Sequence, residues 1–566
     1  MLTRRALLAS AAVSPLLAAG YTATHAQLEP PGEDVLVATP VATPEAHIVP
    51  DLTGVTPLPL TGERLATFEA YVAAKLAEAT VPGAAVAVVQ NGEVVFQQGF
   101  GVREIGQPAP VTPDTLLRIG SVTKSFSSLL TATLVDAGRL SWDTPLVDLL
   151  PDFAVADPAL TPRLTARDAF CACTGLPRRD FEFIFNAHEL TPELLIEGMA
   201  ELPLTAPYGE KYQYSNQMVA AGGFAAAAAA GGSPHDLGHA YAIALRERVL
   251  NPIGMPQTTL ALTDVLADDD YAMPHAADVT GALQRVPLLD DDLWLVPVAP
   301  SGALWSSASE MARYVQTELQ RGVNPDGQRV VSAENLERTW QPSVELQAGP
   351  GTPPDMAAFA GHYALGWVLG AYGGQRLVWH SGGTLGFTAL VGFMPDADLG
   401  FVILTNRSET AGPFTYAVQF RLLELLFDQP AAFDALLAAS LTSAAEGRAD
   451  QLAHLEEIDP AAVTPYLGRY ANPALGEVTL ALQEASLILV AGAVRSQLLP
   501  RTDDEGAVTG YLPATPPWAS YPPDPVLTFE DDDDRPKLVM TVRGDPGDEN
   551  VVYTFESIEV AATPTP

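Results

Sequence analysis

The sequence predicts an α/β (α+β) protein, with an antiparallel sheet flanked by helices, a helical subdomain, and an all-β domain after them. A β-hairpin is predicted around Asn91-Gly92, because Asn-Gly between two apolar runs is the strongest short turn signal. Strand-like runs return after a long, proline-rich and mostly helical stretch, at 376–380, 388–393 and 401–405. From about residue 461, short alternating runs separated by turn residues indicate a second, all-β domain.

The elements before and around the sheet follow from apolar spacing. A helix is predicted over 63–79, and strands over 84–89 and 93–98 form the hairpin. A second helix is expected to begin at Ser121, after a strand and turn at 118–120, and to stop at Gly138. Its apolar stripe consists of Val122, Phe126, Leu129, Leu130 and Leu134. An amphipathic helix over 414–427 closes the sheet region.

The predicted domain boundaries follow changes in composition. A signal peptide is expected over 1–26, and a linker rich in Pro, Thr and Ala over 27–60. The main domain spans 61–435, and a helical connector rich in Ala and Glu spans 436–460. The β domain covers 461–560, with strands expected at 477–482, 487–490, 526–529, 537–542 and 551–558.

The N-terminus is typical of an export signal. Arg4 and Arg5 precede an apolar stretch over 6–20, and 24–26 offers a small-residue cleavage site. Residues 3–8 resemble a twin-arginine signal, while an ordinary secretory signal is the alternative. We therefore expect export to the periplasm or the extracellular space. No later segment is apolar and long enough to form a transmembrane helix after signal removal.

The charge balance excludes one class of partner. With 30 basic and 68 acidic residues, the formal net charge is −38, so a phosphate backbone would be repelled and nucleic acid is not expected as a partner. The acidic runs are expected to be solvated loops, at 268–270, 290–292 and 531–534. Calcium binding is a lesser alternative, since none has the regular ligand spacing of an EF-hand.

No metal, cofactor or disulfide is predicted. Cys171 and Cys173 are the only cysteines, and residues two apart seldom reach disulfide geometry, so we expect buried free thiols. Two cysteines supply only two of the four ligands that a structural zinc site requires. His235 and His239 have the spacing of a zinc-binding helix, but Asp236 stands where such helices carry the glutamate base.

Ser121 and Lys124 form the most informative motif. Residues three apart lie on one helix face, and the serine stands where a helix begins. The amine can take the hydroxyl proton, and the helix N-terminus favours developing negative charge, so the pair predicts a serine nucleophile. The alternative is a helix-capping serine beside a solvated lysine. Of the four lysines, only Lys124 has this spacing.

Two further motifs follow in order. Tyr214 and Asn216 lie in a polar loop before a helix over 220–230, where a phenol can relay a proton and an amide can hold a substrate carbonyl. His380-Ser381-Gly382-Gly383 comes directly after a strand. Glycines there let the backbone approach a ligand, and a free N–H can face an oxyanion.

These motifs resemble those of class C serine β-lactamases, D,D-peptidases and related esterases. That family has Ser-x-x-Lys, Tyr-x-Asn and Lys/His-x-Gly in this order and at about these intervals. Further similar segments lie at 174–177, 251–255, 301–312 and 363–367. The resemblance covers about 61–430. The β domain, with 466–470, resembles the small C-terminal barrel of one branch of the family.

The resemblance implies a β-lactamase/D,D-peptidase-like fold and specific roles. Ser121 would be the acylated nucleophile, Lys124 its base, and Tyr214 the group that serves the leaving group. Asn216 would orient the substrate, His380-Ser381-Gly382-Gly383 would line the substrate site, and the N–H groups of Ser121 and Gly383 would form the oxyanion hole. The implied function is an exported serine hydrolase acting through an acyl-enzyme, without a cofactor. Its substrates would be D-Ala or D-amino-acid peptides, β-lactams or small esters.

Two departures from the family pattern matter. His380 stands where many lactamases have lysine, so a preference for carboxylate substrates is predicted to depend on pH. Ala172 replaces a histidine that we interpret as structural. The alternative function is a penicillin-binding-type covalent sensor or a non-catalytic binding protein with the same fold. A small molecule or peptide is the expected ligand, while its identity and the oligomeric state are left open by the sequence.

Overall fold

The computed structural model describes residues 49–558, apart from 289, 348–353, 409–410, 493, 521–524, 533–534 and 544–549. The expected signal peptide and most of the expected linker lie outside the described residues. Among the helices that are described, none has the length and apolar character needed to cross a membrane. Residues 49–60 were assigned to the linker, yet they pack on the sheet. Gln375 donates hydrogen bonds to Leu52 O and Val55 O, and Leu60 is buried.

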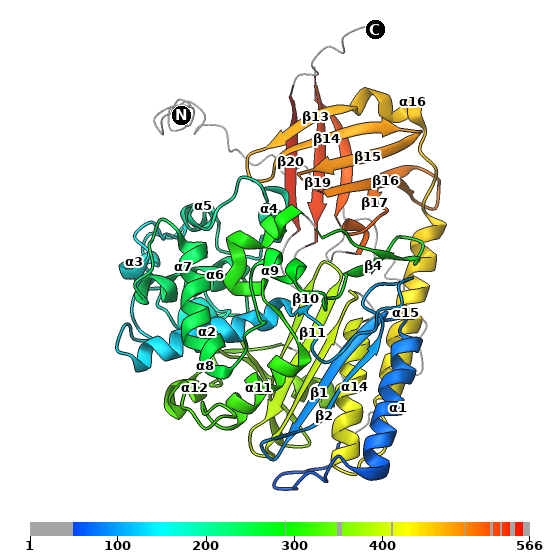
Figure 1. Cartoon of the computed structure of the whole chain (residues 1–566). Helices are drawn as coiled ribbons and strands as arrows, with labels where there is room; N and C mark the ends of the chain where they lie inside the picture. Colours follow the sequence, from blue (N-terminus) through cyan, green and yellow to red (C-terminus); the bar gives the residue numbers. More distant parts are fainter. Residues whose placement is uncertain are drawn as a thin grey trace. The chain divides into compact units, whose positions relative to one another are not determined.

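One antiparallel sheet of eight strands organises the main domain, in the order β2-β1-β12-β11-β10-β9-β8-β7 (Figure 1). The strands are β1 Gly83–Gln90, β2 Glu93–Gly101, β7 Val344–Glu345, β8 His362–Tyr363, β9 Val368–Tyr372, β10 Gln375–Thr384, β11 Phe387–Met394 and β12 Leu399–Thr405. The predicted hairpin is confirmed as β1 and β2, with Asn91 and Gly92 both at positive φ in the turn. The strands predicted to return late in the domain are confirmed as β10, β11 and β12.

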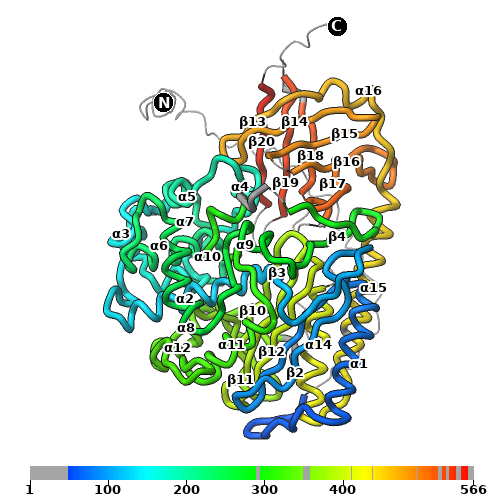
Figure 2. The backbone as a smooth tube through the Cα atoms, viewed as in Figure 1, coloured from blue at the N-terminus to red at the C-terminus, as the bar shows by residue number. Residues whose placement is uncertain are grey.

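Both faces of the sheet are covered, which explains why β1 is buried along its whole length. Ala84, Val86 and Val88 face a core shared with α1 Gly62–Glu78 and α14 Ala411–Leu426. These two helices lie side by side on that face of the sheet (Figures 1 and 2). Ala85, Ala87 and Val89 face a second core, to which α11 Ala308–Leu319 and the helical subdomain contribute.

The helical subdomain is built around α2 Thr123–Asp136 and α6 Asn216–Ala229. The helix expected from Ser121 starts as one 3-10 turn, η1 Gly120–Val122, and continues as α2. Its predicted apolar stripe is buried. Helix α6 is buried almost all round, and Gly223 leaves room for the Pro300 ring, because an added Cβ would lie 2.3 Å from it.

Shorter elements complete the domain. The remaining helices are α3 Leu146–Leu149, α4 Asp180–Phe185, α5 Pro192–Gly198, α7 Leu237–Leu245, α8 Asn251–Ile253, α9 Leu262–Ala267, α10 Ala299–Gly302, α12 Ala333–Arg338 and α13 Pro354–Phe359. Two small antiparallel sheets pair β3 Leu117–Arg118 with β6 Trp305–Ser306, and β4 His275–Ala277 with β5 Leu283–Arg285.

A closed eight-stranded barrel follows the connector helix α15 Asp434–Ala453 and the short α16 Pro460–Val463. Its strands are β13 Gly468–Asn472, β14 Gly476–Gln483, β15 Ser486–Ala491, β16 Val494–Thr502, β17 Val508–Pro513, β18 Val526–Asp532, β19 Arg535–Val542 and β20 Val551–Ile558. The all-β prediction is confirmed. Sequence reasoning missed β13, β16 and β17, where alternation is interrupted by Gly, Pro or Arg residues.

The barrel packs on helix α4 through aromatic rings. Trp518, in the short η8 Trp518–Ser520, stacks on Phe181 at 5.4 Å between ring centroids and meets Phe185 edge-on at 4.6 Å. Asn186 Nδ2 donates a hydrogen bond of 2.6 Å to Ala474 O in the barrel. The apolar core is therefore continuous between the helical subdomain and the barrel.

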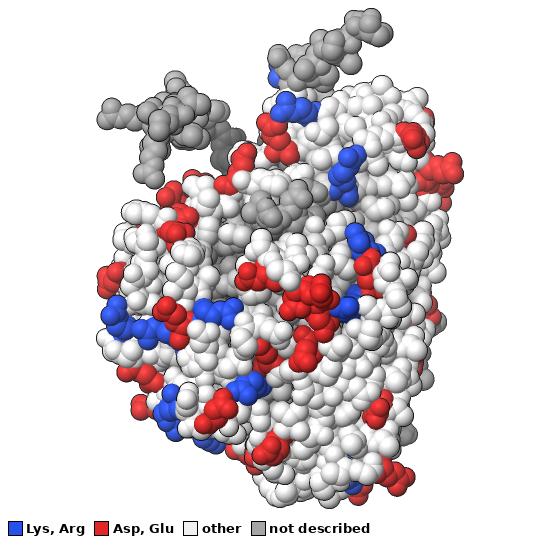
Figure 3. All heavy atoms as spheres, in the orientation of Figure 1, with Lys and Arg blue, Asp and Glu red and all other residues white. Residues whose placement is uncertain are grey.

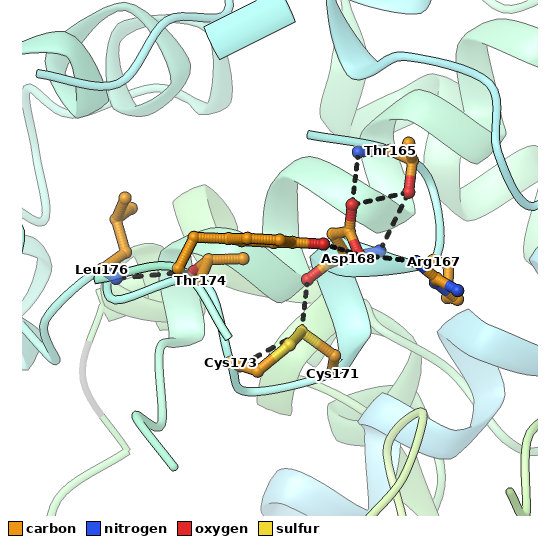
Figure 4. The surroundings of a disulfide bond; sticks show 8 residues. Thr165, Arg167, Asp168, Cys171, Cys173, Thr174 and Leu176 are labelled. Carbon is orange, nitrogen blue, oxygen red and sulfur yellow. Dashed lines mark hydrogen bonds and ion pairs between the residues drawn. A yellow bond between two sulfur atoms is a disulfide. The ribbon is translucent and has the colours of Figure 1, made fainter. Parts of the chain in front are cut away.

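The cysteine prediction is wrong, because Cys171 and Cys173 form a disulfide (Figure 4). Ala172 between them adopts φ +51°, a left-handed conformation that folds the chain tightly and brings the two Cα atoms to 5.2 Å. Asp168, one turn earlier, accepts hydrogen bonds from the N–H and hydroxyl of Thr165. The bridge thus closes a short, well-bonded loop before the turn at 174–177.

Acidic side chains outnumber basic ones on the face drawn in Figure 3. The run at 268–270 is more than a solvated loop, which corrects the prediction. Asp270 accepts hydrogen bonds from the hydroxyls of Thr112 and Thr115 and forms an ion pair with Arg103. It therefore fixes the turn that precedes β3 and, with it, the entry to the Ser121 turn.

Candidate active site

The structure brings Ser121 and Lys124 together at the start of α2. Lys124 Nζ lies 3.1 Å from Ser121 Oγ, as the three-residue spacing predicts. Ser121 is half-buried, while the Lys124 side chain is completely buried. A lysine without solvent contact needs polar partners, since burying an unpaired ammonium is very costly.

The polar partners of Lys124 are compatible with a neutral amine. Its Nζ lies 2.7 Å from Asn216 Oδ1 and 2.7 Å from the carbonyl oxygen of Ser301. An ammonium would donate to both oxygens and to Ser121 Oγ, whereas a neutral amine would use its two N–H groups on the two carbonyl oxygens. The remaining lone pair then faces Ser121 Oγ, which is the arrangement required to accept the hydroxyl proton.

Electrostatics favour the same state. Burial lowers the pKa of Lys124 well below the usual lysine range; the Asp180 carboxylate raises this pKa and the Arg178 guanidinium lowers it further. The lowered pKa makes Lys124 easier to deprotonate than an exposed lysine, as a general base requires.

Asp180 is a site residue that sequence reasoning missed. It begins α4, is buried, and its Oδ1 accepts a hydrogen bond of 2.8 Å from Asn216 Nδ2. Arg178 Nε binds the other oxygen, Oδ2, at 2.6 Å. A possible signal was the Arg-Arg-Asp sequence directly after the turn at 174–177, because a carboxylate there must be neutralised.

Tyr214 closes the other side of Lys124. Its ring lies 4.6 Å from Lys124 Nζ, and its hydroxyl hydrogen-bonds with Ser121. Burial raises the pKa of Tyr214, so its hydroxyl keeps its proton at neutral pH. Tyr214 is thus suited to donate a proton, while Lys124 is suited to accept one.

Strand β10 approaches the Ser121 turn through glycine. A Cβ on Gly382 would lie 1.9 Å from Ile119 O, and one on Gly120, whose φ is +53°, would lie 2.7 Å from Gly383 N. Gly383 itself has open space on its Cβ side. The two-residue turn Leu385-Gly386 makes Thr384 and Phe387 the hydrogen-bonded pair, so the N–H of Gly383 points away from β11. That N–H and the N–H of Ser121 therefore lie near one another.

His380 lies near Tyr214 in the site, with 6.4 Å between the two ring centroids. The motif belongs to β10, so successive side chains point to opposite faces. His380 is buried against Tyr363, whose hydroxyl lies 3.0 Å from His380 Nε2. Ser381 hydrogen-bonds with Tyr416 of α14. Burial lowers the pKa of His380 to about 3, with Lys124 adding to the effect, so the predicted titration of this residue near neutrality is wrong.

A cavity of about 530 Å³ opens beside Ser121. Ser121, Asn216, Asp180 and Gly383 line it, whereas Lys124, Tyr214 and His380 do not. Its apolar wall consists of Phe183, Val279, Val286, Trp294, Leu295, Val298, Leu385 and Phe387. The connector helix and the barrel complete the wall with Ala444, Arg448, Gln451, Pro517 and Ala519.

Within the described residues, no group of three or more His, Cys, Asp or Glu side chains is placed to hold an ion. His239 lies in α7, and His235 precedes that helix in a turn.

The chain belongs to the beta-lactamase family, which it matches over residues 68–426. Among curated relatives, it is 28% identical over 343 residues to "Unguisins hydrolase ungD'" of Aspergillus campestris, covering 58% of this chain and 59% of that protein. It is also 28% identical over 337 residues to "Penicillin-binding protein 4" of Amycolatopsis lactamdurans, covering 59% of this chain and 83% of that protein.

A solved structure shares the fold. The octameric penicillin-binding protein homologue from Pyrococcus abyssi superposes with a TM-score of 0.55 at 22% identity, covering 87% of this chain and all of that one. The chain spans about three fifths of the length of the unguisins hydrolases that it matches.

Proposed function

We propose that this protein hydrolyses small amides or esters through an acyl-enzyme on Ser121. The observation that carries the proposal is the position of Lys124, whose buried Nζ lies 3.1 Å from Ser121 Oγ and hydrogen-bonds to two carbonyl oxygens. D-Ala peptides, D-amino-acid peptides, β-lactams and small esters are the substrate classes. Hydrolase and penicillin-binding names among the relatives favour the same chemistry.

In acylation, Ser121 Oγ attacks the substrate carbonyl carbon while its proton passes to Lys124 Nζ. Negative charge develops on the carbonyl oxygen and is stabilised by the N–H groups of Ser121 and Gly383. The bond to the leaving group breaks as Tyr214 donates its proton to that group, and Lys124 returns a proton to Tyr214. Water then attacks the ester by the reverse transfers, releasing the acid and restoring Ser121.

Export is part of this proposal. The support within the described residues is the Cys171–Cys173 disulfide, because disulfides persist in oxidising compartments and are rare in the cytosol. Expression of the full chain in a bacterial host, followed by fractionation and N-terminal sequencing, tests it. Cleavage after residue 26 and recovery outside the cytoplasm would support it, and an intact cytoplasmic chain would contradict it.

Intact-mass spectrometry after exposure to a fluorophosphonate tests the nucleophile. We expect one adduct on the wild-type protein, none on Ser121→Ala, and one on Ser141→Ala, which changes an exposed serine in a distant loop. An adduct that persists on Ser121→Ala would refute the assignment. Circular dichroism shows whether each variant is folded.

Esters, β-lactams and D-Ala peptides then separate turnover from sensing. Steady turnover identifies a hydrolase. A single burst that ends with one acyl group per Ser121 identifies the covalent sensor instead. If folded wild-type protein shows neither turnover nor a burst, and fluorophosphonate also fails to label it, a binding role is favoured.

A further inference from the structure

The substrate cavity extends away from the leaving-group side of the site. Tyr214, which protonates the leaving group in the proposed reaction, does not line this cavity, whereas Asn216 and Gly383 do. The cavity therefore holds the acyl part of the substrate, and this conclusion rests on the proposed function. Its walls then decide which acyl groups are accepted.

One wall comes from outside the main domain. Ala444, Arg448 and Gln451 occur at intervals of four and three residues, so they form one face of the connector helix α15. Pro517 and Ala519 of the barrel lie in the same lining. A part of the chain that carries none of the reacting groups thus contributes to acyl recognition.

Among the described residues, no anion pairs with Arg448 in this cavity. Its guanidinium rests on Gly281, where an added Cβ would lie 2.9 Å from Nη1, and it forms no ion pair or side-chain hydrogen bond with any other described residue. The chain has more than twice as many acidic as basic residues, 68 against 30. An arginine left unneutralised in a cavity is therefore unexpected on composition alone.

The carboxylates in the same cavity are already bound. Asp180 is paired with Arg178 and Asn216. Asp278 accepts hydrogen bonds from its own loop: from the N–H and hydroxyl of Thr280, from Ala282 N–H, and from Gln284 Nε2. Neither carboxylate serves Arg448, so the guanidinium is available to a ligand.

We propose that Arg448 binds a carboxylate at the distal end of the substrate's acyl group, with the apolar wall of the cavity holding the chain between that carboxylate and the scissile carbonyl. The planar guanidinium matches a carboxylate in a two-pronged contact. His380 is neutral and buried, so it does not supply this cation. The preferred substrates are therefore half-esters or half-amides of dicarboxylic acids and acidic acyl peptides.

Paired substrates test this inference. One series consists of 4-nitrophenyl half-esters of dicarboxylic acids with four to eight carbons, and the matched series has the distal carboxylate capped as a methyl ester. We expect wild-type kcat/KM to favour the free acid for at least one chain length. In Arg448→Gln that ratio should fall by about 10- to 100-fold, the range of a hydrogen bond to a charged group, and Arg448→Lys should restore part of it.

Arg495→Gln is the matched control, because Arg495 is exposed on the barrel, where it binds Gln483. A ratio that is unchanged in Arg448→Gln, or lowered equally in Arg495→Gln, would overturn the inference. Calorimetry on Ser121→Ala with and without Arg448→Gln, using the same half-esters, measures recognition without turnover. Weaker binding on loss of Arg448 supports the inference even if no turnover occurs, and equal binding contradicts it. Fluorophosphonate labelling of Ser121 reports separately on the proposed function.

Discussion

Asn216 donates its Nδ2 hydrogen bond to Asp180 at 2.8 Å, and this contact decides which end of the amide faces Lys124. A carboxylate can only accept, so Nδ2 must face Asp180 and Oδ1 must face the amine. Two residues from different segments, 36 positions apart, thereby set the hydrogen-bond state of the proposed base. This relationship makes Asp180 a positioning residue with a distinctive pH signature.

Asp180→Asn should keep the amide oriented, since its side-chain oxygen can still accept from Asn216. The Asp180 carboxylate raises the pKa of Lys124, so its loss should lower that pKa further. We expect the acid limb of kcat/KM to move to lower pH. Asp180→Ala should instead lower kcat/KM by about 10- to 100-fold, as lost orienting contacts do. Identical pH profiles for wild type and Asp180→Asn would contradict this role.

Lys124→Arg should abolish rapid labelling of Ser121. A guanidinium stays protonated and cannot take the serine proton, so we expect a loss of about 10²- to 10⁴-fold in the labelling rate, the usual range for a general base. In wild type, the rate should rise with pH through the lowered pKa of Lys124 and be substantial at neutral pH. Lys211→Arg is the control, because Lys211 is only half-buried and lies three residues before Tyr214. A similar loss in Lys211→Arg would make the effect non-specific.

Gly382 and Gly383 offer a matched pair. Gly382→Ala places a Cβ 1.9 Å from Ile119 O, so β10 must move away from the Ser121 turn and labelling should be lost. Gly383→Ala meets nothing within 4 Å, so the fold and the labelling should survive, with altered selectivity for acyl groups. Thermal unfolding and labelling rates of the two variants test whether Gly382→Ala is more damaging than Gly383→Ala. The reverse order would show that the close approach is unimportant.

Trp518→Ala should weaken the site from a distance. Its ring packs on Phe181 and Phe185 of α4, the helix that begins with Asp180. We expect a loss of about 3–5 kcal/mol in stability, typical of a buried tryptophan, and a fall in kcat that Trp518→Phe partly restores. Val508→Ala, at an exposed barrel position, should change neither. Loss of stability with full kcat would separate the barrel from the chemistry.

Glu318 should make stability fall with rising pH. This carboxyl is buried and accepts a hydrogen bond from Trp340 Nε1, and burial raises its pKa to about 8. The folded protein keeps this proton after the unfolded chain has lost it. The contribution of the Glu318 carboxyl to the free energy of unfolding is therefore complete below about pH 4.5. It declines by about 1.4 kcal/mol per pH unit up to about pH 8.

Glu318→Gln should flatten this dependence of stability on pH. The difference in stability between Glu318→Gln and wild type should therefore favour the variant more at pH 8.5 than at pH 5.5. Melting temperatures over this range measure it, with the exposed Glu505→Gln as the control. Parallel curves for wild type and Glu318→Gln would refute the assignment of the buried proton to this residue.

Local patterns predicted the elements that depend on neighbouring residues. The Asn91-Gly92 hairpin, the Ser121–Lys124 spacing and the late strands of the sheet all follow from turn chemistry or periodicity. Tyr214 and Asn216 also meet Lys124, as the order of the motifs suggested. Their roles in catalysis stay predictions until the nucleophile is tested.

The rest depended on contacts between distant segments. Asp180 gains its position from Asn216 and Arg178, and Arg448 reaches the cavity from the connector, so no local pattern marks either. The titration of His380 near neutrality was predicted because its burial by Tyr363 is invisible in sequence. The Cys171–Cys173 bridge was missed because it requires Ala172 at positive φ, which alanine rarely adopts.

The wall formed by α15 and the barrel has a consequence for how such an enzyme can diversify. The proposed reacting groups all precede residue 384, whereas part of the cavity lining comes from residues 444–519. The groups that react and part of the wall that selects the acyl group thus come from separate stretches of the chain. Exchanging the later stretch by recombination would change which acyl groups the enzyme accepts. It would not alter any atom that makes or breaks a bond.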